Sequence, residues 1–155
     1  MDPEKLKEEV AKKRKDDWIE AWLAFEAVAI NKEIAEESLK SHVERMGKSR
    51  EIFIYEKTTK ESKQMKEVPA HLKKKLPADA QLWSHVAEVR ALCKDFYSLL
   101  NLVVLFGPSA VEIIGPNSKI MKLDEMQNIA NTIAGLLHEF AAAGVGGVII
   151  SGERS

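Results

Sequence analysis

No glycine occurs before Gly47, and no proline lies between Pro3 and that glycine, so this stretch lacks the residues that most often end a helix. Asp2 and Pro3 suit the N-cap and the first position of a helix, and Gly47 suits its C-cap. Large apolar residues recur mostly in steps of three and four, which is the spacing of one helical face. We therefore predict one long helix over residues 3–46, with a break near Asn31 as the alternative.

The middle of the chain predicts a strand and a second long helix. Residues 51–55 form a short run rich in β-branched and aromatic side chains, which indicates a strand. Apolar residues at helical spacing fill residues 79–106, and Gly107-Pro108 would end a helix there. We expect the all-apolar second half of this helix to be the central core helix. Two valines leave a strand over residues 102–106 as the alternative.

Seven of the eight glycines lie in the last third of the chain, which indicates that most turns are found there. Residues 110–114 and 119–123 predict two strands, because the Gly-Pro-Asn-Ser segment between them is a turn sequence. Asp124 suits the start of a helix as its cap. Residues 145–150 then predict a last buried strand, paired in parallel through a right-handed crossover.

Together these segments predict an α+β protein. Its parts are a long N-terminal helix and two further helices, packed on a small mixed sheet of about four strands. The length of 155 residues is typical of one domain. We divide this predicted domain into a helical arm, residues 1–47, and an α+β body, residues 48–155.

The composition excludes several classes of protein. Charged residues make up 30% and hydrophobic residues 45%, which is too apolar for a disordered chain. The charged start has no apolar segment after it, as a signal peptide would, and the apolar run at 99–106 is too short to cross a bilayer. A single cysteine cannot form an internal disulfide. We therefore expect a cytoplasmic protein without a membrane partner.

The sequence contains no recognisable catalytic, metal or cofactor motif. The residue three places before each of the four histidines is apolar or glycine, whereas a helical di-metal site would have glutamate there. Cys93 lies on or beside an apolar stripe, which predicts a buried side chain rather than a nucleophile. The glycines at 144–147 lead from a helix into a strand, the reverse of a phosphate-binding loop. We expect no cofactor.

The most basic segment runs from Lys57 to Lys75 and is the candidate for an anion or nucleic-acid patch. Its seven lysines are Lys57, Lys60, Lys63, Lys66, Lys73, Lys74 and Lys75. They would suit the phosphates of a nucleic acid. However, the segment has no arginine and only Tyr55 as a nearby aromatic platform. A solvated loop is therefore favoured, an acidic protein partner is a third interpretation, and residues 71–73 predict one helical turn.

The apolar stripe near the N-terminus is the candidate partner interface. It consists of Leu6, Val10, Trp18 and Trp22, and its first turns are otherwise polar. A helix with so thin a stripe either projects into solvent or meets a partner helix. We favour a non-enzymatic scaffold that forms a homodimer or binds a protein partner through this helix. A nucleic-acid-associated protein that uses the lysine segment is the alternative, and an enzyme whose site assembles only in space is the third.

Overall fold

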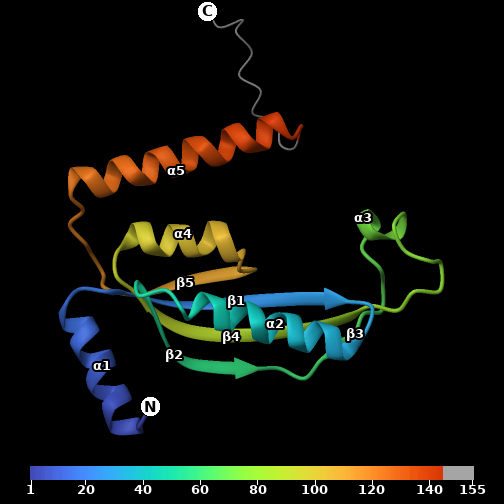
Figure 1. Cartoon of the computed structure of the whole chain (residues 1–155), viewed down its shortest axis with the longest axis horizontal. Helices are drawn as coiled ribbons and strands as arrows, with labels where there is room; N and C mark the ends of the chain where they lie inside the picture. Colours follow the sequence, from blue (N-terminus) through green and yellow to red (C-terminus); the bar gives the residue numbers. More distant parts are fainter. Residues whose placement is uncertain (145–155) are drawn as a thin grey trace, which may run out of the picture. The chain divides into compact units, whose positions relative to one another are not determined.

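The computed structural model describes residues 1–144. The elements are α1 (Pro3–Lys15), β1 (Ile19–Ala29), α2 (Lys32–Met46), β2 (Ile52–Thr59), β3 (Lys63–Gln64), α3 (Ala70–Lys73), β4 (Trp83–Cys93), α4 (Phe96–Phe106), β5 (Ala110–Gly115) and α5 (Leu123–Ala142) (Figure 1). The chain divides into two compact units, residues 1–119 and 120–155. Within residues 1–144, no helix combines the length and apolar character that a membrane crossing needs.

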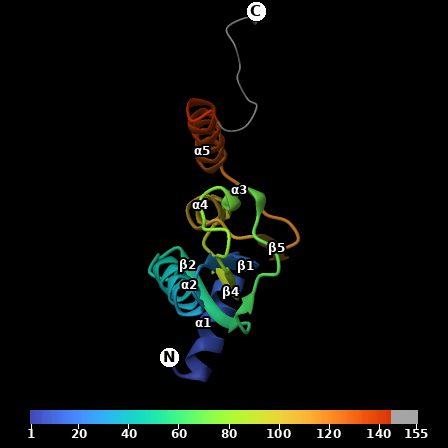
Figure 2. The same cartoon turned by 90° about the vertical axis from the view of Figure 1, so that its right-hand side faces the viewer.

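The first unit is built on a five-stranded sheet. Four strands lie in the order β2-β4-β1-β5, and the short β3 pairs with the start of β4. All pairings are antiparallel, and β1 pairs with β4 over its whole length of 11 residues. Among the described residues, β5 therefore forms one edge of the sheet and β2 the other (Figure 2).

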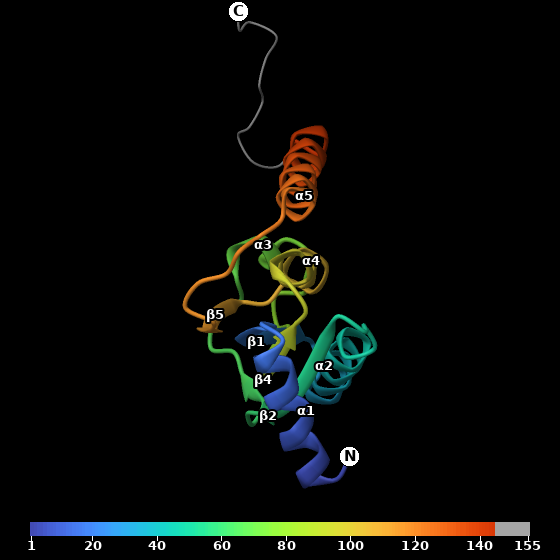
Figure 3. The same cartoon turned by 90° about the vertical axis from the view of Figure 1, so that its left-hand side faces the viewer.

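Helices α2 and α4 cover one face of this sheet, and the core lies beneath them (Figure 3). Every second residue of β1 and β4 faces these helices, because side chains alternate along a strand. The largest fully buried side chains on this face include Leu23 and Phe25 of β1 and Val89 of β4. Met46 of α2 and Leu102 of α4 pack against them.

Helix α1 packs on the opposite face of the sheet, near β2. Val10 is only 7% exposed. The Lys13 ammonium lies 4.9 Å from the ring centroid of Phe53 in β2. The register pairs Phe53 with Leu92, and Leu92 with Glu20, so these three side chains share the face that α2 and α4 leave free.

The second unit, as far as it is described, consists of α5. This helix has 20 residues and presents Met126, Ile133, Leu137 and Phe140 at the spacing of one helical face. Each of these side chains is exposed, and no residue of α5 is buried.

The prediction of one helix over residues 3–46 is wrong, because β1 interrupts it. α1 ends at Lys15 in a Schellman motif: Asp17 N–H donates to the carbonyl of Arg14, and Trp18 N–H donates to that of Lys13, at 3.2 and 3.0 Å. Asp17 takes the left-handed conformation that glycine usually supplies, with φ of 59°. The helix therefore ends without the residue type on which the prediction depended.

The predicted helix over residues 79–106 is wrong in its first half, where β4 lies. Asp95 separates this strand from α4 and caps the helix, because its Oδ1 accepts the N–H of Ser98 at 2.7 Å. The second half is helical, so the alternative of a strand there is also wrong. α4 covers the sheet as a surface helix and is not the central element, since Leu105 is 74% exposed.

The remaining expectations are confirmed in part. The α+β class, the strand that contains residues 52–55, the helical turn at 71–73 and the strand at 110–114 are all found. The sheet has five strands and is antiparallel in the part of the chain described, not mixed. Residues 119–123 form no strand, and the last helix is capped at Lys122 without a side-chain bond. The strand predicted at 145–150 lies outside the described residues.

Candidate functional site

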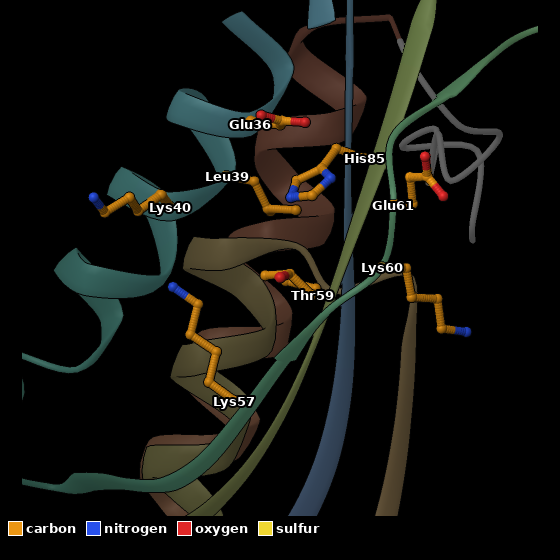
Figure 4. A pocket seen from close by; sticks show the side chains of 9 residues that line it. Glu36, Leu39, Lys40, Lys57, Thr59, Lys60, Glu61 and His85 are labelled. Atoms are coloured by element: carbon orange, nitrogen blue, oxygen red, sulfur yellow. The ribbon is translucent and has the colours of Figure 1, made fainter. Parts of the chain in front are cut away.

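A pocket of about 590 Å³ opens on the helix-covered face of the sheet, between α2, β2 and β4. Its lining includes Glu36, Leu39 and Lys40 of α2, Lys57 and Thr59 of β2, and His85 and Ala87 of β4. Figure 4 shows the His85 ring directed from β4 toward α2. Lys60 and Glu61 also line the pocket, with side chains on the other side of the β2 ribbon from Lys57 and Thr59 (Figure 4). The volume falls within the range of small-molecule sites.

Three side chains beside this pocket form a continuous row of hydrogen bonds. The Oγ of Ser62 lies 2.6 Å from Oε1 of Glu36 and 2.9 Å from Nδ1 of His85. A carboxylate only accepts, so the single hydroxyl proton of Ser62 is donated to Glu36. Nδ1 of His85 must then donate to Ser62. Consequently Nε2 is an acceptor while the ring is neutral and a donor once the ring is protonated.

Three elements that are distant in sequence hold this row in place. Asn31 caps α2 by accepting the N–H of Ile34 at 2.9 Å, which fixes the start of the helix that carries Glu36. Ser62 lies in the connection between β2 and β3 and is buried. His85 is paired with Ala27 across the sheet and is 8% exposed. Sequence reasoning missed this row because no local spacing links its members.

Two lysines at the pocket have no anionic partner among the described residues. Neither Lys40 nor Lys57 forms an ion pair or hydrogen bond within residues 1–144. Lys60 differs, because its ammonium lies 2.9 Å from Oε1 of Glu88. Glu36 is approached by Lys32 of the same helix at 4.0 Å. The pocket therefore carries two cations that neither of its lining carboxylates, Glu36 and Glu61, approaches within ion-pair distance.

The row of Glu36, Ser62 and His85 differs in its order from a nucleophilic triad. In such a triad the acid orients the histidine, and the histidine takes the proton of the serine. Here the serine lies between the other two, and its proton is directed away from the histidine. The arrangement therefore does not activate Ser62. It orients His85, whose Nε2 can accept a proton from a bound group or donate one to it.

A second polar cluster, on the opposite face, fastens α1 to the sheet. Arg14 binds Glu20 through two bonds of 3.0 and 2.5 Å, and the Tyr55 hydroxyl donates to the same carboxylate at 2.5 Å. The Arg14 hydrogen bond lowers the pKa of Glu20 below its usual value, against the effect of burial. Burial and the bond to Glu20 raise the pKa of Tyr55. The cluster is internally satisfied, so we assign it a structural role.

The four residues of the predicted partner interface do not form one helical stripe. Leu6 and Val10 lie on α1, and Val10 is buried within the first unit. Trp18 follows the helix and lies with its ring 4.7 Å from the Lys13 ammonium. Trp22 belongs to β1 and is half-buried.

The seven lysines of the basic segment are spread over several elements. Lys57 and Lys60 both line the pocket, and Lys60 also pairs with Glu88. Lys63 lies on β3, Lys73 ends α3, and Lys66, Lys74 and Lys75 lie in the connections around α3. The structure thus divides the predicted patch between a pocket, an ion pair and a connection that extends beyond the end of the sheet (Figure 1).

The edge strand β5 exposes large apolar side chains. Val111 is 41%, Ile113 51% and Ile114 41% exposed. β5 pairs with β1 and, among the described residues, with no other strand. Leu105, near the end of α4, is also exposed, and only three residues separate α4 from β5. A surface of this kind is typical of an interaction site.

Comparison with known proteins places these features in a family. A family model matches residues 20–150. The chain belongs to the MJ0538 family. No curated protein and no solved structure matches the chain. The residues that match the MJ0538 family include the pocket and β5 but not α1, so the family relationship covers the sheet and its two covering helices rather than the N-terminal helix.

The single cysteine lies in the core and is not part of the candidate site. Cys93 is fully buried in the core, and burial raises the pKa of its thiol to about 12, so the prediction of a buried cysteine is confirmed. In the described part of the chain, no three His, Cys, Asp or Glu side chains are grouped so that they could hold a metal ion.

Proposed function

We propose that this member of the MJ0538 family is a protein-interaction module that self-associates through β5. The observation that supports this proposal is the exposure of Val111, Ile113 and Ile114 on an edge strand. The outer edge of such a strand presents unpaired N–H and C=O groups, which can pair with a further strand. The scaffold role expected from the sequence is retained, but its surface moves from the N-terminal helix to the sheet.

β5 has few of the devices that usually protect an edge strand. Lysine, proline, inward-pointing charges and bulges normally prevent pairing between chains. β5 contains neither lysine nor proline, and its one charged residue is Glu112. A bulge lies near its end, between Ile113 and Gly115, and residues 110–113 keep a regular register with β1. These residues therefore offer a short, regular and mostly apolar edge.

A second copy of the chain is the partner that this edge fits best. Two antiparallel copies of one strand are related by a two-fold axis, which is also the commonest symmetry of homo-oligomers. An axis at Glu112 would place two like charges opposite each other, which is unfavourable. An axis at Val111 pairs the two valines and places each Glu112 opposite Ala110 of the second copy. We therefore propose the register centred on Val111.

The N-terminal helix is a weaker candidate for this role. Val10, its most apolar inward residue, is already buried against the sheet. The remaining large apolar residue of α1 is Leu6. A partner helix would thus meet little apolar surface there, unless α1 first left the sheet and the bonds between Arg14 and Glu20 were broken.

Sedimentation of the full chain over a hundredfold concentration range tests the proposal. We expect a dimer that dissociates on dilution, and a monomer for the variant Val111→Lys with Ile113→Lys. The matched control is Thr58→Lys with Glu56→Lys on the opposite edge, which should leave the dimer intact. Deletion of residues 1–14 should likewise leave it intact. A wild type that is monomeric throughout would contradict the proposal, and loss of the dimer only after the deletion would return the interface to α1.

A further inference from the structure

We propose that the pocket between α2, β2 and β4 binds a small phosphorylated ligand, through Lys57, Lys40 and His85. This site is separate from the β5 edge and does not depend on self-association. It rests on the unpaired charges, the oriented imidazole and the volume of the pocket, which are considered in turn.

The charge of the pocket fits an anion. Lys40 and Lys57 come from α2 and β2, which face each other across the opening, and neither ammonium has a carboxylate partner within residues 1–144. Figure 4 shows the Lys57 side chain directed toward α2. The Lys40 side chain extends from α2 away from His85 in Figure 4, and its flexible four-carbon chain must turn to reach a ligand. A phosphate group would supply the negative charge that the two ammonium groups lack.

The imidazole of His85 fits the same group in either of its protonation states. Ser62 and Glu36 fix the proton on Nδ1 and hold the ring, so Nε2 is the nitrogen left for a ligand. A protonated His85 donates from Nε2 to a phosphate oxygen. A neutral His85 accepts from the P–OH group of a phosphate monoanion. A ligand that can only donate or only accept a hydrogen bond would match only one of the two protonation states of His85.

The lining of the pocket indicates a small molecule rather than a polymer. Leu39 and Ala87 give an apolar part, and the Thr59 hydroxyl adds one further polar group. A volume of about 590 Å³ accommodates a phosphate with an attached organic group. A nucleic-acid groove would need a continuous basic track, yet Lys60 lies on the other side of the β2 ribbon and is paired with Glu88.

Titration of the full chain with inorganic pyrophosphate, followed by calorimetry and by amide NMR, tests this site. We expect a dissociation constant of about 1 mM, which is typical of a fragment that uses a few polar contacts. Lys57→Gln should weaken binding about tenfold, the loss of one charge-assisted hydrogen bond. Lys63→Gln on β3 removes the same charge six residues away and outside the pocket lining, and we expect its affinity to stay within about twofold of the wild type.

The position of the proton on His85 gives an independent readout. Nitrogen-15 NMR of the wild type should show the proton of the neutral ring on Nδ1, and pyrophosphate should shift the Nε2 resonance. His85→Gln should abolish the millimolar binding, and if this buried substitution unfolds the chain, the exposed Lys57→Gln still decides the matter. Equal losses in Lys57→Gln and Lys63→Gln, or no binding at 10 mM, about ten times the expected constant, would overturn the proposal. Tighter binding of a single-stranded oligonucleotide than of pyrophosphate would also overturn it, in favour of a polymer site.

Discussion

The two edge strands of the sheet present opposite chemistry to solvent. β2 carries Glu56 and Lys57, is followed by Lys60, and has a bulge in its pairing with β4 between Ile54 and Glu56. β5 carries exposed valine and isoleucine around one glutamate. Charges and bulges are common protections of an edge strand. β5 also has a charge and a bulge, but these are one glutamate and a bulge at the end of the strand. We therefore propose that β2 is the closed edge of the sheet and that β5, as far as residues 1–144 show, is the open edge.

The contrast between the two edges shows that lysines at the β2 edge can have two roles at once. Alternation along the strand directs Lys57 to the face covered by α2, where it lines the pocket, while Lys60 pairs with Glu88 on the other side. Both place a charge at that edge and both line the pocket, but only Lys57 lacks an anionic partner within residues 1–144. Lysines that protect an edge are therefore not evidence of a nucleic-acid patch.

The largest effect on stability is expected in helix α4, because its inner residues pack the helix onto the sheet. Leu99 is buried in the core, whereas Leu105 is exposed near β5. Leu99→Ala should lower the free energy of unfolding by about 2–5 kcal/mol, and Leu105→Ala by less than about 0.5 kcal/mol. Urea denaturation of both variants measures the difference. Similar losses would show that the outer face of α4 is packed as tightly as the inner face.

The next largest effect on stability is expected where α1 is attached to the sheet. This helix packs on the face that α2 and α4 leave free, beside β2 and not beside β5. Glu20→Gln should cost about 1–3 kcal/mol, since it weakens the charged bonds to Arg14. The folded pKa of Glu20 is lowered, so its stabilisation is fully present above the unfolded pKa and is lost as the pH falls through the folded value. The denaturation midpoint of the wild type should therefore fall more steeply below about pH 4 than that of Glu20→Gln.

A pH dependence that is the same in both proteins would mean that Glu20 is not the group that couples α1 to the sheet. Tyr55→Phe is a useful companion, because it removes one bond to Glu20 and leaves the ion pair with Arg14 in place. Its effect should be smaller than that of Glu20→Gln.

The smallest effect is expected at the turn that joins α1 to β1. Asp17→Gly should stabilise the fold by about 0.5–1 kcal/mol, because glycine takes the left-handed conformation without the cost that a side chain incurs. Asp17→Ala, the control, should not stabilise it. Thermal unfolding of the two variants measures this. A loss of stability in Asp17→Gly would show that the aspartate side chain contributes more than the backbone geometry costs.

The same turn explains much of what the sequence could not predict. Local composition predicts the α+β class, strand β2, the helical turn α3 and strand β5, because each of these elements has a strong local pattern. β1 and β4 do not, since alanine fills many of their inward positions, so that the apolar residues also fit a helical spacing. Asp17 and Asp95 end and begin helices without glycine or proline nearby. The residue types at these two positions therefore do not indicate where α1 ends or where α4 begins.

The candidate site was still less predictable than the fold. Glu36, Ser62 and His85 lie 26 and 23 residues apart, on elements that meet only after the sheet has formed. The alternation that places His85 on the covered face is the one local signal, and the apolar residues around it also fit a helical spacing. The exposure of β5 could not be foreseen either, because its composition is that of an ordinary buried strand.

Cysteine cross-linking at the two edges tests the central claim most directly, and the native thiol does not interfere because Cys93 is buried, with its pKa raised to about 12. A two-fold axis at Val111 brings the two copies of that residue directly opposite each other, within reach of a disulfide. Under mild oxidation, Val111→Cys should form a covalent dimer rapidly, and Lys57→Cys on the β2 edge should not. Faster linking of Ile113→Cys would move the axis within β5. If neither β5 variant links faster than Lys57→Cys, the account of an open and a closed edge is contradicted.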